Sequence, residues 1–219
     1  MGAVLTVLIN KPNKSARKAK GDGHLRRAEI LDAAQRIFIE YGYQGATIRK
    51  IADEVGVSST ALYMHFRDKS EILVEISQSA FAQVIAQNDS IAAAEPDPIL
   101  RVRKILEAYI DFGLAQPHTY LLVFSPSEAI LTEEKAAALD ALGLKTYERF
   151  RESVAEIAAK GVLRTEDVDA ASQTAWMSAH GLTSLLICRP NFPWAEQERL
   201  KTLMLDSLFH GLLSACAPR

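Results

Sequence analysis

The chain has 219 residues, and with 48% of them hydrophobic it can bury a core of its own. No apolar run is long enough to span a bilayer, and the apolar residues 1–10 lack the preceding basic region of a signal peptide. Because Cys188 and Cys216 have no metal-type spacing, neither a disulfide framework nor a metal site is indicated, and a cytoplasmic protein is expected.

The formal net charge of −2 is unevenly distributed. Residues 1–70 contain twelve Lys and Arg against seven Asp and Glu, a net +5, and the remainder has a net −7. Residues 1–23 are predicted to form a flexible basic arm that attracts phosphates or enters a minor groove, although a solvated leader without a role fits equally well. The cations that precede or open the first helix are Lys11, Lys14, Arg17, Lys18, Lys20, Arg26 and Arg27.

The first predicted helix covers Ala28–Tyr41, and Gly42 is placed to end it. Its apolar residues recur at helical spacing and form one stripe. They are Ile30, Ala34, Ile37, Phe38 and Tyr41.

A second, shorter helix follows at Thr47, where the hydroxyl can cap the backbone and the helix N-terminus can face an anion such as a phosphate. Gly56 suits the left-handed backbone that ends a helix, and either Ser58 or Ser59 can cap the next one. The buried face is predicted from apolar residues at i, i+3, i+4 and i+7. They are Ile48, Ile51, Ala52 and Val55.

The third helix is expected to give Ala61, Leu62 and Phe66 to the core. Short polar and aromatic side chains remain outward, of the kind that reach phosphates and base edges in a major groove. They are Ser59, Thr60, Tyr63, Met64 and His65. Two short helices with a tight turn are common in all-α proteins, but three in this order are typical of a DNA-binding head.

A longer helix is predicted to follow, capped by Asp68 and with Lys69 in its first turn. A cation there opposes the helix dipole, so Lys69 is expected to serve a phosphate and to be poorly placed for stability alone.

From Ile30 to Leu73, ILDAAQRIFIEYGYQGATIRKIADEVGVSSTALYMHFRDKSEIL, the chain closely resembles the TetR-type family of bacterial transcriptional repressors. The resemblance implies an all-α homodimer with a helix-turn-helix head at 24–70 and an effector-binding and dimerisation domain at 71–219. By motif position it implies that Thr47, Tyr63, His65 and Lys69 hold the sugar-phosphate backbone. The positions implied to face bases or neighbouring phosphates are Arg49, Ser59, Thr60, Ala61 and Met64, and Ser58 begins the same surface.

The C-terminal domain is expected to be helical throughout, with prolines and glycines between the helices. The predicted segments are Ile99–Gln116, His118–Phe124, Lys135–Lys160 with Thr132 before it, Asp167–Cys188 and Glu196–Cys216.

The last two helices carry seams of small and apolar residues that would let two subunits approach closely. The same pattern permits packing inside one subunit. A dimer would require a pseudo-palindromic operator, because its two recognition helices read half-sites related by symmetry. The seam residues are Ala171, Ala175, Ser178, Leu182, Leu185, Leu200, Met204, Leu208, Gly211 and Leu212.

Aromatic and polarisable side chains in the middle helices are candidates for an effector pocket, although each fits an ordinary helical core better. His180 can instead be a satisfied core or interface histidine. Their low charge suggests a hydrophobic or aromatic effector, with no cofactor or metal. They are Tyr109, Phe112, Tyr120, Phe124, Tyr147, Phe150, Trp176, Met177 and His180.

A helical small-molecule-binding protein or an enzyme with no DNA role is the alternative, but no recognisable catalytic motif is present. The sequence therefore predicts a non-enzymatic, DNA-binding transcriptional regulator. We expect a repressor that leaves its operator when an effector favours a conformer with lower DNA affinity.

Overall fold

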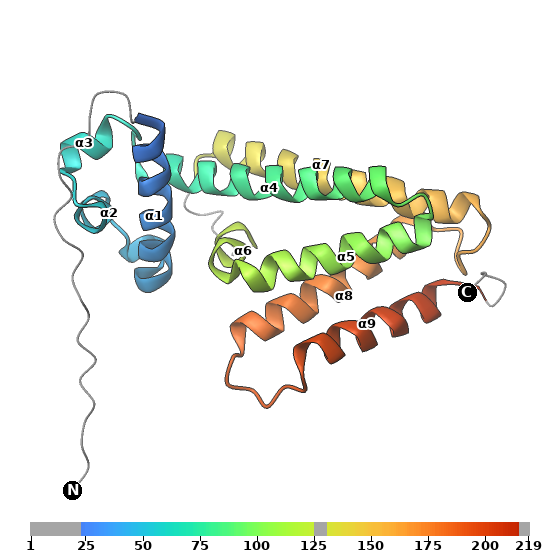
Figure 1. Ribbon diagram of the computed structural model, residues 1–219. Coiled ribbons are helices and arrows are strands. Elements are labelled where there is room, and N and C mark those ends of the chain that lie inside the picture. The colour runs from blue at the N-terminus through green and yellow to red at the C-terminus, as the bar shows by residue number, and fades with distance from the viewer. Residues whose placement is uncertain (1–22, 125–130, 215–219) are drawn as a thin grey trace, which may run out of the picture. The chain divides into compact units, whose positions relative to one another are not determined.

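The computed structural model describes residues 23–124 and 131–214, which are helical apart from turns and one isolated β-bridge (Figure 1). The all-α prediction is therefore confirmed. The chain divides between Lys69 and Ser70 into two compact units. The proposed basic arm at 1–23 lies almost entirely outside the described residues. No helix in the described ranges combines the length and apolar character that a membrane crossing requires.

The first unit contains α1 (Gly23–Gly45), α2 (Ile48–Val55) and α3 (Ser59–Tyr63). The predicted break at Gly42 is present as a kink, since this residue has φ 66° and ψ 165° inside α1. Glycine adopts this backbone at no steric cost. The buried side chains are Ile30, Ala33, Ala34, Ile37, Phe38, Ala46, Ile51, Ala52, Leu62 and Phe66.

The second unit holds α4 from Ser70 onward and the five helices that follow it. Their bounds are α4 (Lys69–Ala94), α5 (Pro98–Ala115), α6 (Pro117–Phe124), α7 (Glu133–Ala159), α8 (Val168–Cys188) and α9 (Gln197–Leu212). Side-chain oxygens cap four of these helices at their N-termini, where backbone N–H groups have no partner inside the helix. The capping residues are Asp97, Thr132, Asp167 and Glu196.

The core of this unit forms around α5, which contacts α6, α7, α8 and α9. The aliphatic face of α5 packs against aromatic and aliphatic residues of α7 and α9 and against small residues of α8. Alanines on α8 let its backbone approach α5 closely. The cluster comprises Val102, Ile105, Leu106, Ile110, Phe150, Val154, Ile157, Ala171, Ala175, Ala179, Leu205 and Phe209.

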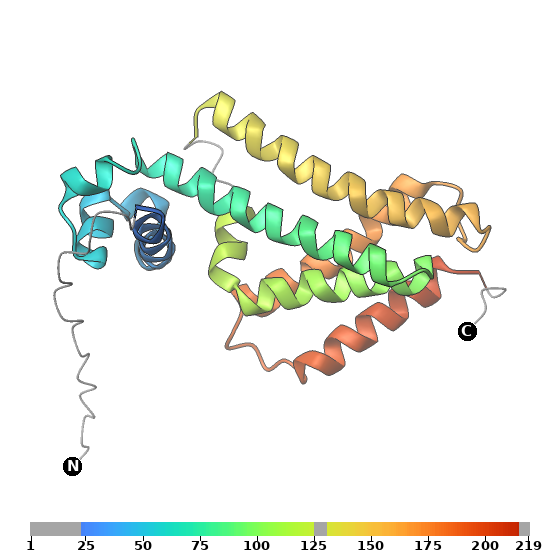
Figure 2. The same cartoon turned by 45° about the horizontal axis from the view of Figure 1, so that its top comes forward.

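Helices α4 and α7 run in the same direction through this unit (Figure 2). Lys135 donates to the Ser70 hydroxyl at 2.6 Å, and Arg149 pairs with Asp89 at 2.7 Å. The first contact joins the N-terminal turns of the two helices, and the second joins turns further along both. The two helices are therefore parallel.

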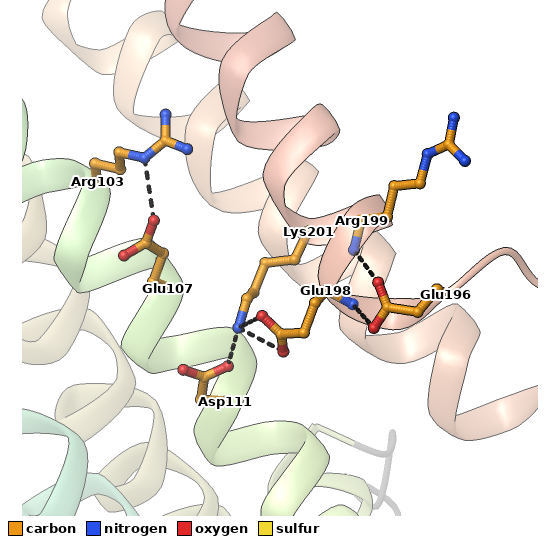
Figure 3. Close-up of polar contacts among 7 residues, drawn as sticks. All are labelled: Arg103, Glu107, Asp111, Glu196, Glu198, Arg199 and Lys201. Carbon is orange, nitrogen blue, oxygen red and sulfur yellow. Dashed lines mark hydrogen bonds and ion pairs between the residues drawn. The ribbon is translucent and has the colours of Figure 1, made fainter.

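Charged side chains tie α9 to α5 along their exposed sides. Lys201 reaches from α9 to Asp111 on α5 at 2.7 Å, as Figure 3 shows. Further along the same two helices, Arg103 contacts Asp206 at 2.7 Å. The carboxylates of both pairs are more than half exposed, so each pair adds little stability to the contact of α9 with α5.

The last helix ends at Leu212, so its predicted continuation to Cys216 is wrong for the described residues. Leu213 is extended and forms an antiparallel bridge with Leu163. The Arg164 N–H donates to the Leu212 carbonyl at 2.9 Å, and the Ser214 N–H donates to the Val162 carbonyl at 2.9 Å. These long-range backbone hydrogen bonds replace the helical ones.

Candidate functional site

The turn between α2 and α3 is built as the sequence predicts. The Lys50 N–H donates to the Thr47 hydroxyl at 3.2 Å, so Thr47 caps α2. Gly56 has φ 76°, the left-handed backbone that ends the helix. Of the two candidate caps for α3 the structure selects Ser58, whose hydroxyl accepts from the Ala61 N–H at 3.1 Å.

The outer surface of α3 and its C-cap presents large side chains to solvent. Tyr63 is 55% exposed and Met64 is 83% exposed. Thr60 is exposed beside them, while His65 is half-buried. Ala61 is also exposed, so its expected place in the core is wrong, because Leu62 and Phe66 alone fill that side.

The two capping hydroxyls keep a hydrogen-bonding capacity. A hydroxyl that accepts from the backbone still has its own proton to donate. Thr47 and Ser58 are both exposed, and so is Arg49, whose side chain is 87% exposed beside Asp53 at 3.9 Å. Thr47, Arg49 and Ser58 therefore each offer a hydrogen-bond donor to solvent.

Lys69 has a structural role that the sequence did not reveal. Its ammonium donates to the Tyr43 carbonyl at 2.7 Å and to the Ala46 carbonyl at 3.0 Å, and it lies 4.3 Å from the centre of the Tyr43 ring. Burial lowers the pKa of Lys69 below its usual value. The expectation that this lysine is poorly placed for stability alone is wrong, because it braces the turn from α1 to α2.

Two further cations brace the same unit. Lys50 donates to the Gly45 carbonyl at 2.8 Å and lies over the Tyr41 ring. Arg27 donates to the His65 carbonyl and lies 4.1 Å from the centre of the Phe66 ring. Cation–π contacts of this kind favour a fixed geometry of the turns.

The second unit contains a cavity of about 760 Å³. Side chains of α4, α5, α6, α7 and α8 line it, so it lies wholly within this unit. Seven of the nine candidate effector residues are among the lining residues. They are Tyr109, Phe112, Phe124, Tyr147, Phe150, Trp176 and Met177.

Helix α4 and the first half of α7 supply a large part of the wall that sequence reasoning missed. Asn88 is 8% exposed on α4, and only the structure shows that this polar residue is buried. No local pattern in the sequence shows that α4 and α8 line one cavity. The missed lining residues include Ser77, Phe81, Val84, Asn88, Leu139 and Thr146.

Tyr120 and His180 are not among the lining residues and form a polar cluster with Tyr109. The Tyr109 hydroxyl lies 2.8 Å from His180 Nδ1, and the Tyr120 hydroxyl lies 2.7 Å from the same atom. Burial lowers the pKa of His180, raises that of Tyr109 to about 12 and raises that of Tyr120. His180 is therefore a half-buried histidine that two tyrosine hydroxyls contact, and Tyr109 links this cluster to the cavity.

Tyr147 differs from Tyr109 because its buried hydroxyl has no hydrogen-bond partner among the described residues. Its ring lies 6.0 Å from the Trp176 ring, and both side chains line the cavity. The lining residues that the structure describes include no Lys or Arg, and Asp140 is the charged member of the set.

The seam residues of α8 and α9 fall into two groups. Ala171 and Ala175 are only 2% and 1% exposed in the single chain. These two residues therefore pack inside the subunit. Leu182, Met204, Leu208 and Leu212 also pack against this core. Ser178 and Leu200 are half-buried, whereas Gly211 and Leu185 are exposed, Leu185 by 51%. The sequence missed Leu203, an apolar α9 residue that is 60% exposed.

Comparisons with known proteins match both units. The family model described as "Bacterial regulatory proteins, tetR family" matches residues 30–76, and "Tetracyclin repressor-like, C-terminal domain" matches residues 102–208. The transcriptional regulator AcrR of Shigella flexneri is 30% identical over 146 residues, 64% of this chain and 67% of that protein. The transcriptional repressor AcnR of Corynebacterium diphtheriae is 40% identical over 67 residues, 29% of this chain and 35% of that protein.

A solved structure shows the same fold. The TetR family regulator PfmR from Thermus thermophilus matches with a TM-score of 0.72 and 26% identity, over 83% of this chain and 97% of that chain. The chain spans about a third of AcnR and two thirds of AcrR. An all-α head with a helix-turn-helix and a helical second unit with a cavity agree with the family that these matches name. The chain belongs to the TetR family.

Proposed function

We propose that this protein is a sequence-specific, DNA-binding transcriptional regulator that acts as a repressor in the cytoplasm. The observation that carries this proposal is the exposed surface of α3 and its C-cap, where Tyr63 is 55% and Met64 83% exposed on the second helix of a helix-turn-helix. Family membership and the repressor AcnR among the relatives support the same function.

In this proposal α3 enters the major groove. Thr47, Tyr63 and His65 hold the sugar-phosphate backbone, and the third ammonium proton of Lys69 remains for a phosphate. The residues that face bases or neighbouring phosphates are Arg49, Ser58, Ser59, Thr60, Ala61 and Met64.

The functional form in this proposal is a homodimer that reads a pseudo-palindrome. Exposed apolar side chains on α8 and α9 support an interface there, because solvated Leu185 and Leu203 would be covered by a second copy. The two ion pairs between α5 and α9 keep α9 in place for this contact.

The cavity is the proposed effector site, and occupancy lowers the affinity of the dimer for its operator. The effector can act only if it binds two conformers of the protein with different affinities. Tyr109 belongs both to the cavity wall and to the cluster with Tyr120 and His180, so an occupied cavity can bias the packing of α5, α6 and α8.

DNA binding is tested by fluorescence anisotropy on DNA from the region upstream of the protein's own gene, at two salt concentrations. Tyr63→Phe should weaken binding about evenly for all sequences, whereas Thr60→Ala should change which half-site is preferred. Tyr41→Phe is the matched control, because Tyr41 is an exposed tyrosine of the same unit outside the proposed surface. Absence of salt-dependent DNA binding by the folded protein would favour a carrier or enzyme instead.

A further inference from the structure

Part of the cavity wall is exposed to solvent, and this part lies on α7 and α8 alone. The other wall residues that the structure describes are buried or half-buried. The wall therefore meets solvent between α7 and α8. We call its exposed residues the cavity mouth, and they are Asp140, Leu144, Gln173, Trp176 and Met177.

The packing of α7 on α8 explains where the mouth lies. Phe150 of α7 shares a buried cluster with Ala171 and Ala175 of α8. From this contact toward the N-terminus of α7 the two ribbons diverge in both views (Figure 1 and Figure 2). Leu144, six residues before Phe150, is 57% exposed, and Met177, two residues after Ala175, is 60% exposed. The wall is therefore closed where the two helices pack and open where they separate.

The mouth carries polar groups with free hydrogen-bonding capacity. Asp140 and Gln173 make no hydrogen bond or ion pair with another described residue. A carboxylate accepts hydrogen bonds, and a carboxamide both donates and accepts them. Deeper in the wall, Leu73, Ile105 and Phe112 are apolar and buried. The cavity thus combines an apolar interior with a polar end in contact with water.

Asp140 gives the mouth a negative charge. No Lys or Arg is among the described lining residues, and residues 125–130 of the sequence contain neither. Lys145 follows on α7, but side chains five residues apart point about 140° away from each other around an α-helix, so it faces another side. A cation at the mouth is therefore attracted, and an anion is repelled.

The interior and the mouth favour different parts of a ligand. An apolar body gains free energy when it leaves water for the buried wall, and a volume of about 760 Å³ accommodates a drug-sized body. A charged group inside would lose its hydration without finding a partner. At the mouth the same group keeps its contact with water.

The proposed dimer leaves this mouth accessible. Trp176 and Leu185 are nine residues apart on α8, which is about two and a half helical turns. Their side chains therefore point to opposite sides of the helix. A second copy that covers Leu185 leaves the Trp176 side uncovered.

We propose that the effector is an amphipathic molecule with a cationic head, that its apolar body fills the cavity and that its head stays at the cavity mouth beside Asp140. Asp140 is then the residue that selects a cationic head over an anionic one. The Gln173 carbonyl can accept a further hydrogen bond from the same head. This inference rests on the proposed function only in calling the ligand an effector.

The test uses isothermal titration calorimetry without DNA and three probes that share one tail: octylammonium, 1-octanol and octanoate. Asp140→Asn removes the charge and keeps the shape of the side chain. The matched control is Glu148→Gln, at an exposed residue of α7 that does not line the cavity. It lies eight residues, or about 12 Å, along the helix from Asp140, beyond the screening length of about 8 Å at 0.15 M salt.

The natural protein should bind octylammonium at least about threefold more tightly than octanoate. Asp140→Asn should weaken octylammonium relative to 1-octanol by about twofold to fivefold, the range of an exposed ion pair. It should also strengthen octanoate relative to 1-octanol. Glu148→Gln should leave both ratios within about 1.5-fold of the natural values.

Octanoate that binds the natural protein as tightly as octylammonium would overturn the inference, as would natural affinity ratios in Asp140→Asn. Equal changes in Asp140→Asn and Glu148→Gln would overturn it by showing a general effect of surface charge. Absence of binding for all three probes would overturn it as well. Each result is a ratio of affinities within one protein, so a partly unfolded variant does not distort it. Because no DNA is present, failure here leaves the proposed DNA binding intact, and failure to bind DNA leaves this result intact.

Discussion

Tyr109 and Tyr147 line one cavity and differ in what their hydroxyls hold. The Tyr109 hydroxyl bonds His180, while the Tyr147 hydroxyl has no partner among the described residues. In the ligand-free protein Tyr147→Phe should raise the free energy of unfolding by up to about 1 kcal/mol, and Tyr109→Phe should lower it by about 1 kcal/mol. Urea unfolding measures both. If Tyr147→Phe is as destabilising as Tyr109→Phe, the Tyr147 hydroxyl has a partner.

His180 should make stability depend on pH. Burial lowers its pKa in the folded protein, whereas in the unfolded chain the pKa returns to about 6.5. As pH falls below about 6.5 the unfolded chain binds a proton that the folded protein does not, so the free energy of unfolding decreases until the folded pKa is passed. Tyr109 and Tyr120, whose pKa values are raised, stay protonated throughout.

The pH dependence is measured by urea unfolding between about pH 7.5 and pH 5.5. His180→Asn should lose less stability than the natural sequence over this interval. His210→Asn, at an exposed position of α9, should retain the natural dependence. A His180→Asn profile parallel to that of the natural sequence would show that His180 does not contribute.

Alanine substitutions at two helical glycines distinguish the cost of steric overlap from the gain in helix propensity. A Cβ at Gly113 on α5 would overlap the Thr183 methyl group on α8 and approach the Tyr120 ring at 2.9 Å. At Gly143 on α7 the first side chain met is Phe81, at an ordinary 3.6 Å. Gly113→Ala should therefore destabilise by about 1–3 kcal/mol, while Gly143→Ala should gain up to about 1 kcal/mol of helix propensity. Thermal unfolding compares them, and equal effects would refute the close approach of α5 and α8.

The helices themselves could be predicted because their signals are local. Caps at Thr47 and Thr132 and the left-handed Gly56 lie within a few residues of the turns they form. The end of α9 could not be predicted, since it depends on the bridge between Leu213 and Leu163, far apart in the sequence. Lys69 was misjudged for the same reason, because its carbonyl partners Tyr43 and Ala46 lie 26 and 23 residues earlier in the sequence.

The sequence predicts more of the proposed DNA-binding surface than of the cavity wall. Most of the proposed DNA-binding surface lies between Ser58 and His65, so the exposure of Tyr63 and Met64 followed from helical spacing, although that of Ala61 did not. The cavity wall comes from five helices, and no local pattern joins Asn88 on α4 with Trp176 on α8. The seam on α8 was ambiguous because small residues suit both a subunit core and an interface, and Ala171 and Ala175 belong to the core.

For the whole molecule, dimerisation should depend on the exposed leucines of α8 and α9. Leu185→Lys combined with Leu203→Lys should give a monomer that binds operator DNA at least about tenfold more weakly, because charges would be buried without partners. Leu100→Lys, at a 49% exposed leucine of α5, is the control and should leave the dimer intact. Analytical ultracentrifugation decides this, and a dimer that persists in the double variant would refute the proposed interface.

The link between cavity and DNA is tested most directly by the operator affinity of the natural protein with and without a saturating apolar aromatic compound whose binding is detected by Trp176 fluorescence. Linkage requires the compound to weaken operator binding by some factor and the operator to weaken binding of the compound by the same factor. We expect at least about fivefold, a typical coupling between two sites. A compound that fills the cavity while operator affinity stays unchanged would contradict ligand-controlled DNA release.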